Sequence, residues 1–306
     1  MASVELLSLE AREAAGELAE SFLSAEPFPH FSFDGLLDAH FLKRLQEEFP
    51  PFAEKNALTD YGEPGGKAVC SEMAKIGPAY RELDALFRSR GFLDWMSRAT
   101  AMPDLLYDPD YYGGGTHENL SGESLDSHVD FNIHPRLRWH RRLNLILFLN
   151  DEWEADWGGS LRLQKNPWAP SAADPIVEIV PRANRCALFE TSERSWHGFE
   201  RIRIPEDRPG LTRRTVAVYF YTKQRPFEEI VPEHGTYYAP APLPERLSGD
   251  DELRALIEAR DRRLRYHWER ERELSEMLEK IDRSPSFRIG RALTWPARKL
   301  RALLRG

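Results

Sequence analysis

The sequence predicts a mainly β protein with flanking helices, whose core is an antiparallel sandwich or jelly roll. From Tyr107 onward, short apolar or alternating runs are separated by Gly, Pro and Asn, which is typical of antiparallel β structure. The first hundred residues instead space their apolar side chains as helices do. After residue 229, a proline-rich segment leads into a long charged helical pattern. Sequential βαβ units do not fit this order.

The N-terminal region, residues 1–103, is expected to be mainly helical and to pack on the core. Residues 4–25 are rich in Glu, Ala and Leu, and residues 34–49 carry apolar side chains at helical spacing before Pro50-Pro51. A third helix is predicted over residues 78–99.

The β domain is expected to span residues 104–228. Its strands are predicted from short apolar or alternating runs bounded by turn residues. The runs are residues 143–149, 160–163, 176–180, 185–189 and 215–221.

The C-terminal part is expected to hold a stiff connector over residues 229–249 and a charged helix with a basic amphipathic tail over residues 250–306. Ser284-Pro285-Ser286 should end the helix. Residues 283–306 contain no acid, and interleave Arg and Lys with Phe, Ile, Leu and Trp. This tail could make a peripheral contact with an anionic membrane surface, or it could dock on the β domain.

Composition sets the broad class of protein. A chain of 306 residues with 41% hydrophobic content can bury a full core. Cys70 and Cys186 are far apart, so neither a disulfide framework nor a zinc knuckle is indicated, and a cytoplasmic setting is expected. No leader pattern and no membrane-spanning apolar run is recognised. A net charge of −8 argues against nucleic acid as a partner; the oligomeric state is not predicted.

A candidate metal site lies in Ser127-His128-Val129-Asp130. On an extended strand, alternate side chains point the same way, so His128 and Asp130 could reach one ion. His197, which lies between two predicted strands, is the natural third ligand. Two histidines and one carboxylate on one face leave open positions for a co-substrate and dioxygen, as iron(II) chemistry requires. An H-x-D pattern alone is weak, because such pairs are common in structural or exposed positions.

Arg214 strengthens this interpretation. It begins a predicted strand seventeen residues after His197, on the same face as Val216 and Val218. A guanidinium there could clamp a carboxylate in a bidentate pair. The alternative is that Arg213 and Arg214 are an exposed basic pair where the strand begins.

Ordered blocks across residues 107–225 resemble the prolyl 4-hydroxylase-like branch of the 2-oxoglutarate/Fe(II) oxygenase superfamily. The blocks are Tyr112-Gly113-Gly114-Gly115, His128-Val129-Asp130-Phe131-Asn132, Arg141-Arg142-Leu143-Asn144 leading to Phe148-Leu149-Asn150, Trp157-Gly158-Gly159-Ser160-Leu161, Pro181 to Phe189, Ser195-Trp196-His197, and Arg214 before an apolar strand.

The resemblance implies a double-stranded β-helix and a dioxygenase that hydroxylates an unactivated carbon–hydrogen bond. It implies Fe(2+) held by His128, Asp130 and His197, with Arg214 anchoring 2-oxoglutarate. Dioxygen would be the second co-substrate, and ascorbate a reductant. Relatives often carry a tyrosine where this chain has Phe148, so that contact must be absent or supplied by another group. Asn144 is a further candidate contact for 2-oxoglutarate, and could equally be a buried amide that satisfies backbone groups.

Other side chains near the motifs are candidates of lower rank. His117 follows the glycine run and could approach the co-substrate, or it could be an exposed loop histidine. His134 and His140 lie in a segment rich in arginine, which could form a basic rim for an anionic substrate or a solvated loop. Paired glycines at 158 and 159 indicate close backbone approach in a packed sheet.

Substrate identity is only weakly indicated. Residues 284–293 loosely resemble tails of bacterial surface-polysaccharide enzymes, which suggests a small molecule, sugar or cell-envelope glycan precursor as substrate. A peptidyl-prolyl hydroxylase is the alternative. Two other classes use similar features: a zinc hydrolase, against which Arg214 argues, and a jelly-roll binding module with a vestigial metal site.

Overall fold

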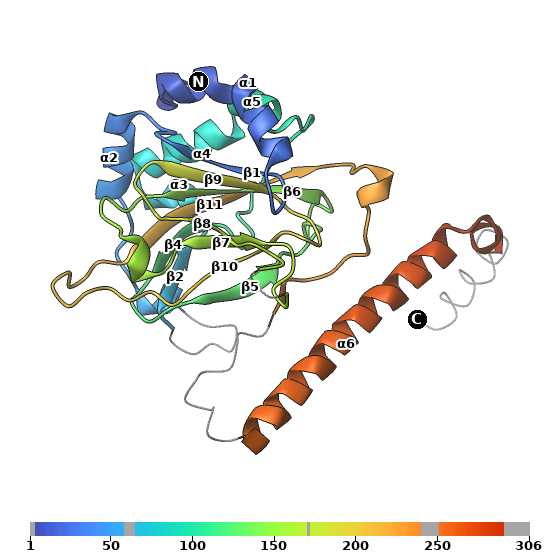
Figure 1. The fold of residues 1–306 in the computed structure, drawn as a ribbon. Coiled ribbons are helices and arrows are strands. Elements are labelled where there is room, and N and C mark those ends of the chain that lie inside the picture. The colour runs from blue at the N-terminus through green and yellow to red at the C-terminus, as the bar shows by residue number, and fades with distance from the viewer. Residues whose placement is uncertain (1–3, 58–64, 170–171, 240–250, 291–306) are drawn as a thin grey trace, which may run out of the picture. The chain divides into compact units, whose positions relative to one another are not determined.

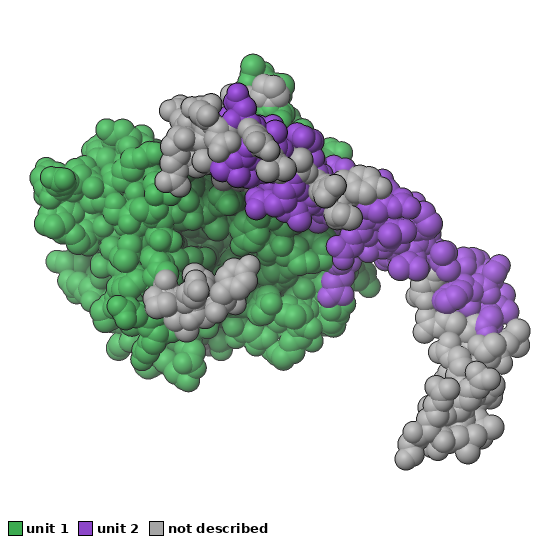
Figure 2. Space-filling model, turned by 90° about the horizontal axis from the view of Figure 1, so that it is seen from below, with its two compact units in different colours: residues 1–225, 234–241 green, residues 226–233, 242–306 purple. Residues whose placement is uncertain are grey.

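A computed structural model of the chain describes residues 4–57, 65–169, 172–239 and 251–290. The chain forms two compact units, coloured separately in Figure 2. Unit 1 holds residues 1–225 and 234–241, and unit 2 holds residues 226–233 and 242–306. The expected connector, residues 229–249, is thus divided between the two units.

Unit 1 is built on two antiparallel sheets. The larger has the strand order β1-β9-β6-β11-β4-β2, with β3 also paired to β11, and the smaller has the order β12-β5-β10-β7-β8. The larger contains β1 (His30–Asp34), β2 (Lys67–Cys70), β3 (Leu106–Tyr107), β4 (Gly115–Asn119), β6 (His140–Phe148), β9 (Arg185–Glu190) and β11 (Arg213–Thr222). The smaller contains β5 (Leu125–Val129), β7 (Leu161–Gln164), β8 (Val177–Ile179), β10 (Trp196–Phe199) and β12 (Tyr237–Tyr238). The predicted mainly β fold with flanking helices is confirmed.

Helices from the N-terminal region cover the outer face of the larger sheet (Figure 1). They are α1 (Leu9–Ser24), α2 (Ala39–Glu47), α3 (Met73–Ile76), α4 (Pro78–Arg88) and α5 (Arg90–Thr100), with short 3-10 turns η1 (Val4–Leu6) and η2 (Glu54–Asn56); a third turn, η3 (Ala155–Trp157), lies in the β region. The prediction of a single helix over residues 78–99 is wrong, because this segment forms two helices, α4 and α5. Ser89 is extended (φ −68°, ψ 144°), ends α4, and caps α5 by accepting a hydrogen bond from the Phe92 N–H.

Two edge strands of the larger sheet come from the region predicted to be helical. β1 pairs with β9, with His30 opposite Phe189, and β2 pairs with β4. Both strands are short and are held by partners far away in the sequence, so local periodicity does not reveal them. The N-terminal region therefore helps to build the β domain as well as covering it.

Alternation along the central strands divides the larger sheet into two faces. Leu145, Val218 and Phe220 are fully buried in the core that the helices cover, where Phe220 lies 6.0 Å from Phe92 between ring centroids. The intervening residues, including Asn144 and Phe148, point toward the smaller sheet. Any site between the sheets must therefore be built from this second set.

Unit 2 contains the 3-10 turn η4 (Phe227–Glu229) and the long helix α6 (Asp251–Arg283). The predicted end of the helix before Ser284 is confirmed. Much of the basic tail, residues 291–306, lies outside the described residues. Within the described part, no helix has the length and apolar character needed to cross a membrane.

Replacing Leu145 by Ala should lower the free energy of unfolding by about 2–5 kcal/mol, because it leaves a cavity in the core beneath the helices. The matched control is Leu23→Ala on α1, whose side chain is 59% exposed and whose loss should change stability by less than about 0.5 kcal/mol. Urea unfolding followed by tryptophan fluorescence measures both. Equal effects of the two substitutions would contradict this assignment of the core.

Candidate active site

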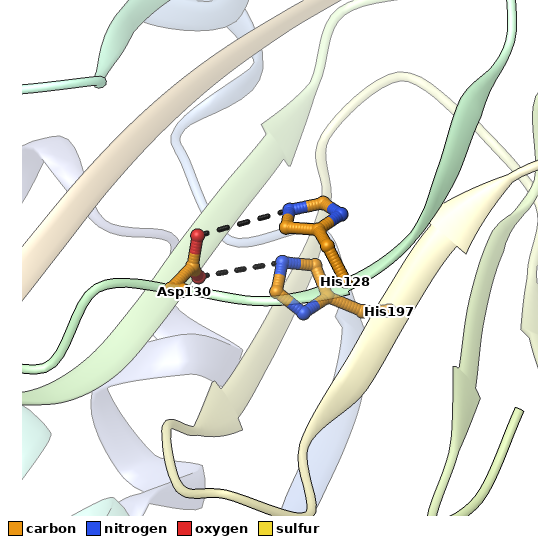
Figure 3. Close-up of side chains that lie close together, drawn as sticks. All are labelled: His128, Asp130 and His197. Carbon is orange, nitrogen blue, oxygen red and sulfur yellow. Dashed lines mark ion pairs between the residues drawn. The ribbon is translucent and has the colours of Figure 1, made fainter. Parts of the chain in front are cut away.

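The three predicted metal ligands come together between β5 and β10 (Figure 3). Antiparallel pairing sets His197 directly opposite His128, and their rings lie 4.2 Å apart between centroids. Asp130 follows β5, with one carboxylate oxygen 3.7 Å from His128 Nε2 and the other 3.4 Å from His197 Nε2. One ligand atom from each residue lies within 4.8 Å of the others. Strand register alone has thus assembled two nitrogens and a carboxylate.

Backbone carbonyls orient both imidazole rings for metal binding. His128 Nδ1 lies 2.9 Å from the Asp126 carbonyl oxygen, and His197 Nδ1 lies 2.9 Å from that of Ser195. Because a carbonyl can only accept, each Nδ1 carries the proton and each Nε2 presents its lone pair toward Asp130. The donor set therefore fits a divalent metal without any change of tautomer.

Burial tunes the protonation of the three side chains. Burial lowers the pKa of His128 to about 3, and also lowers the pKa of His197. Burial of Asp130 would raise the pKa of its carboxyl, but Arg141 and the two histidines hold that pKa below its usual range. The site is consequently ready for a cation at neutral pH, with neutral imidazoles and an ionised carboxylate.

Asn144 and Arg141 hold the Asp130 carboxylate in place. Asn144 Nδ2 donates to Asp130 Oδ2 at 2.7 Å, and Arg141 Nη2 lies 3.0 Å from the same oxygen. Arg141 also donates to Asn144 Oδ1 at 2.7 Å, and its guanidinium stacks 3.5 Å from the Tyr219 ring centroid. Asn144 is therefore a buried amide bonded to side chains of the site, rather than to backbone. The sequence had placed Arg141 in an arginine-rich rim, yet it is 1% exposed on β6.

Arg214 does not point into the space between the sheets, and the expectation that it anchors 2-oxoglutarate needs correction. Its side chain lies on the helix-covered face, donates to Glu118 Oε1 at 3.0 Å, and lies over the Phe49 ring. There it lines a cleft of about 490 Å³ together with Lys43 and Gln46 of α2. An arginine already paired with a buried carboxylate is poorly suited to clamp a second one.

Arg213, one residue earlier, occupies the inner face instead. It is 4% exposed, donates from Nε to the Gly159 carbonyl at 2.7 Å, and lies over the rings of Phe199 and Phe148. Burial lowers the pKa of Arg213 to about 9. Among the residues that the structure describes, no carboxylate pairs with it. A buried guanidinium without an anion is strongly disfavoured unless a ligand supplies the charge.

The close backbone approach expected at the paired glycines occurs at Gly158, where an added Cβ would lie 2.2 Å from the Arg201 carbonyl oxygen, and Gly159 makes room for Arg213. A Cβ atom added to Gly159 would lie 3.2 Å from Arg213 Cδ and 3.0 Å from the Trp153 ring, and its φ of +69° already disfavours other residues. Phe148 lies 5.3 Å from the Arg213 guanidinium, where relatives place a tyrosine. His117 on β4 is on the same inner face, and no described residue forms a hydrogen bond with its buried Nε2.

Aromatic side chains lie near the candidate metal ligands. Tyr238 of β12 pairs with His128 across β12 and β5, and its half-exposed ring lies 5.0 Å from the imidazole. Tyr112, also half-exposed, packs edge-on against Phe131, whose ring lies under Arg141. β12 was not expected, because its two residues fall in the predicted connector.

A second cluster of potential ligands, Asp108, Asp110 and His134, is held by hydrogen bonds of its own. His134 Nδ1 accepts from two backbone N–H groups, so Nε2 carries the proton and donates to Asp108 at 3.3 Å. Arg136 makes a bidentate pair with Asp110. His134 thus has no free lone pair for a metal, and this part of the expected basic rim is a structural network.

Comparisons with known proteins agree with this geometry. Residues 114–221 match the family model described as the 2OG-Fe(II) oxygenase superfamily. No curated protein matches the chain.

Solved structures that resemble it include a prolyl hydroxylase from Trichoplax adhaerens bound to a hypoxia inducible factor peptide fragment (16% identity, covering 70% of this chain and 91% of that chain, TM-score 0.48). Others are a prolyl 4-hydroxylase from Phytophthora capsici (17%, 86% and 76%, 0.49) and HygX from Streptomyces hygroscopicus with nickel and 2-oxoglutarate bound (13%, 64% and 85%, 0.43). At these scores they carry no argument about substrate.

The family match covers the strands that bring the three candidate ligands and Arg213 together. Residues 114–221 of this chain therefore match a 2OG-Fe(II) oxygenase domain, as expected of a 2-oxoglutarate-dependent non-haem iron oxygenase.

Proposed function

We propose that His128, Asp130 and His197 hold the iron and that Arg213, rather than Arg214, holds the distal carboxylate of 2-oxoglutarate. The observation that carries this proposal is the pair of Nδ1-protonated histidines whose free Nε2 atoms face one buried carboxylate. Iron(II) bound there would supply dioxygen activation coupled to oxidative decarboxylation of 2-oxoglutarate. The protein's own task is to position the reactants and to exclude water.

The side chains around the site divide this task. Asn144 and Arg141 fix the orientation of Asp130, so one carboxylate oxygen stays free to face the metal. Arg213 offers its remaining N–H groups to an anion between the sheets, and Phe148 and Phe199 keep water away from that pair. Asn144 is already bonded on both sides, so a direct contact with 2-oxoglutarate would require it to release one partner.

We further propose that the substrate is a sugar-containing small molecule or a glycan precursor, hydroxylated at an unactivated carbon–hydrogen bond. The half-exposed ring of Tyr238 beside His128 offers a flat apolar surface with a polar edge, which suits a cyclic, hydroxyl-bearing substrate. A prolyl peptide also has a cyclic group and is the alternative. Comparison of metabolites and glycans from producing and deletion strains, searched for a gain of one oxygen, separates the two.

The purified protein should form a visible charge-transfer band with iron(II) and 2-oxoglutarate under anaerobic conditions, and should release succinate in air. Asp130→Ala should abolish both, because only two neutral ligands remain. Asp110→Asn, which alters the second cluster, should leave both unchanged. A protein that shows neither signal would instead be a binding module with a vestigial site.

Arg213→Ala should weaken 2-oxoglutarate binding by about 100-fold, because it removes a buried charge-assisted pair. Arg214→Ala removes the same side chain from the adjacent position on the opposite face, and should change binding by less than about threefold. Titration of the charge-transfer band measures both affinities. The reverse order of effects would restore Arg214 as the anchor.

The metal-free protein should lose stability as the pH falls from 7 to 5. The pKa of His128 is lowered in the folded state, so the unfolded chain binds more protons below about pH 6.5, and acid favours unfolding. The effect should be about 2 kcal/mol for His128 over this interval. Urea unfolding at the two pH values should show a smaller difference for His128→Gln than for the wild type. His40→Gln, at an exposed position of α2, is the control and should leave the difference unchanged.

A further inference from the structure

α6 carries a largely aliphatic stripe whose described side chains are mostly exposed. Taking Ile257 as position a of a heptad, the a and d positions from 253 to 281 include six aliphatic residues. They are Leu253, Ile257, Leu264, Leu274, Leu278 and Ile281. Five of these are 40–66% exposed, all except Ile257.

The rest of unit 2 contacts a different face of the helix. Phe227 and Ile230 face α6 across a cleft of about 530 Å³ that is lined on the helix by Glu276, Glu279 and Arg283, all at outer heptad positions. Arg283 lies over the Phe227 ring. Among the described residues, these contacts lie away from the a and d stripe, and a solitary helix of this kind gains little stability in water from its own hydrogen bonds.

Three polar residues, Arg260, His267 and Glu271, interrupt the stripe near its middle, and Arg260 and Glu271 have charges of opposite sign. Arg260 occupies a d position, has a side chain that is 68% exposed, and forms an ion pair with its neighbour Asp261. Glu271 occupies an a position and is exposed. In a parallel pair of helices each would meet its own copy in the interface, which places like charges together.

An antiparallel pair removes this conflict. When Leu253 lies opposite Leu278 of a second copy, Ile257 lies opposite Leu274, and Arg260 lies opposite Glu271. The same register sets Leu264 opposite His267 at the centre. Twofold symmetry repeats each layer, so two opposite-charge pairs flank these central layers and aliphatic layers close both ends. A shift by one heptad would instead set Arg260 against Leu278. We propose that α6 pairs in this antiparallel register with α6 of a second copy of the chain.

Pairing of α6 concerns the assembly of the protein and does not depend on the chemistry proposed for unit 1. Charges at an interface fix orientation and register more than they add affinity. Reversing one charge should therefore destroy the pairing, whereas exchanging both should restore it.

Sedimentation velocity on the full-length chain at micromolar concentrations should give a mass twice the 35.4 kDa of one chain. Arg260→Glu alone and Glu271→Arg alone should each weaken the dimer by at least about tenfold. The chain with both substitutions should dimerise like the wild type. A mixture of the two single variants should also form dimers, because each copy then supplies the charge that the other lacks.

Arg262→Glu and Glu269→Arg make the same charge changes at outer positions of the helix, and should leave the mass unchanged. Far-UV circular dichroism at a concentration where all variants are monomeric confirms that α6 still forms. A wild-type monomer, or single reversals without effect, would overturn the proposal. A double exchange that fails to restore the dimer would overturn the antiparallel register.

Discussion

The pairing of β5 with β10 is the constraint on which the site depends. It sets His197 opposite His128, and each strand then supplies the backbone carbonyl that fixes its own imidazole. A slip of one residue in either strand would turn one histidine out of the space between the sheets. The surrounding layers hold this register: β7 pairs with the other edge of β10, and β12 with the other edge of β5.

The alternation of side chains between the two faces of a strand explains which site residues could be predicted from the sequence and which could not. The proposed metal ligands follow from an H-x-D pattern and the order of strands, because residues two apart on a strand share a face whatever the tertiary structure. The choice between Arg213 and Arg214 depends on which face of β11 the helices cover. Both faces of this strand are buried, so hydrophobic residues on either side of the arginines give no decisive pattern. Val216 and Val218 share the face of Arg214, and this face packs against the helices. Their aliphatic side chains were therefore the one hint that Arg214 points away from the space between the sheets.

Other differences between the predicted and the observed structure also arise from contacts between residues that are far apart in the sequence. The five strands expected from apolar runs are present, because each has buried residues in its own sequence. β1, β2 and β12 are short edge strands held by distant partners, and their sequences resemble turns or connectors. The network around Asp130 was also missed. An arginine such as Arg141 is normally exposed, and its burial makes sense only once Asp130 and Tyr219 are seen beside it.

β12 has a consequence for how substrates can approach. β5 carries His128, and without β12 it would be the last strand of its sheet, with a row of free backbone N–H and C=O groups. Proteins that read extended peptides often do so by letting the peptide join such an edge as an extra strand. Tyr237 and Tyr238 already occupy these hydrogen-bonding positions. A peptide that bound by strand addition beside the proposed iron ligands would have to displace β12, whereas a compact ring-shaped molecule would not.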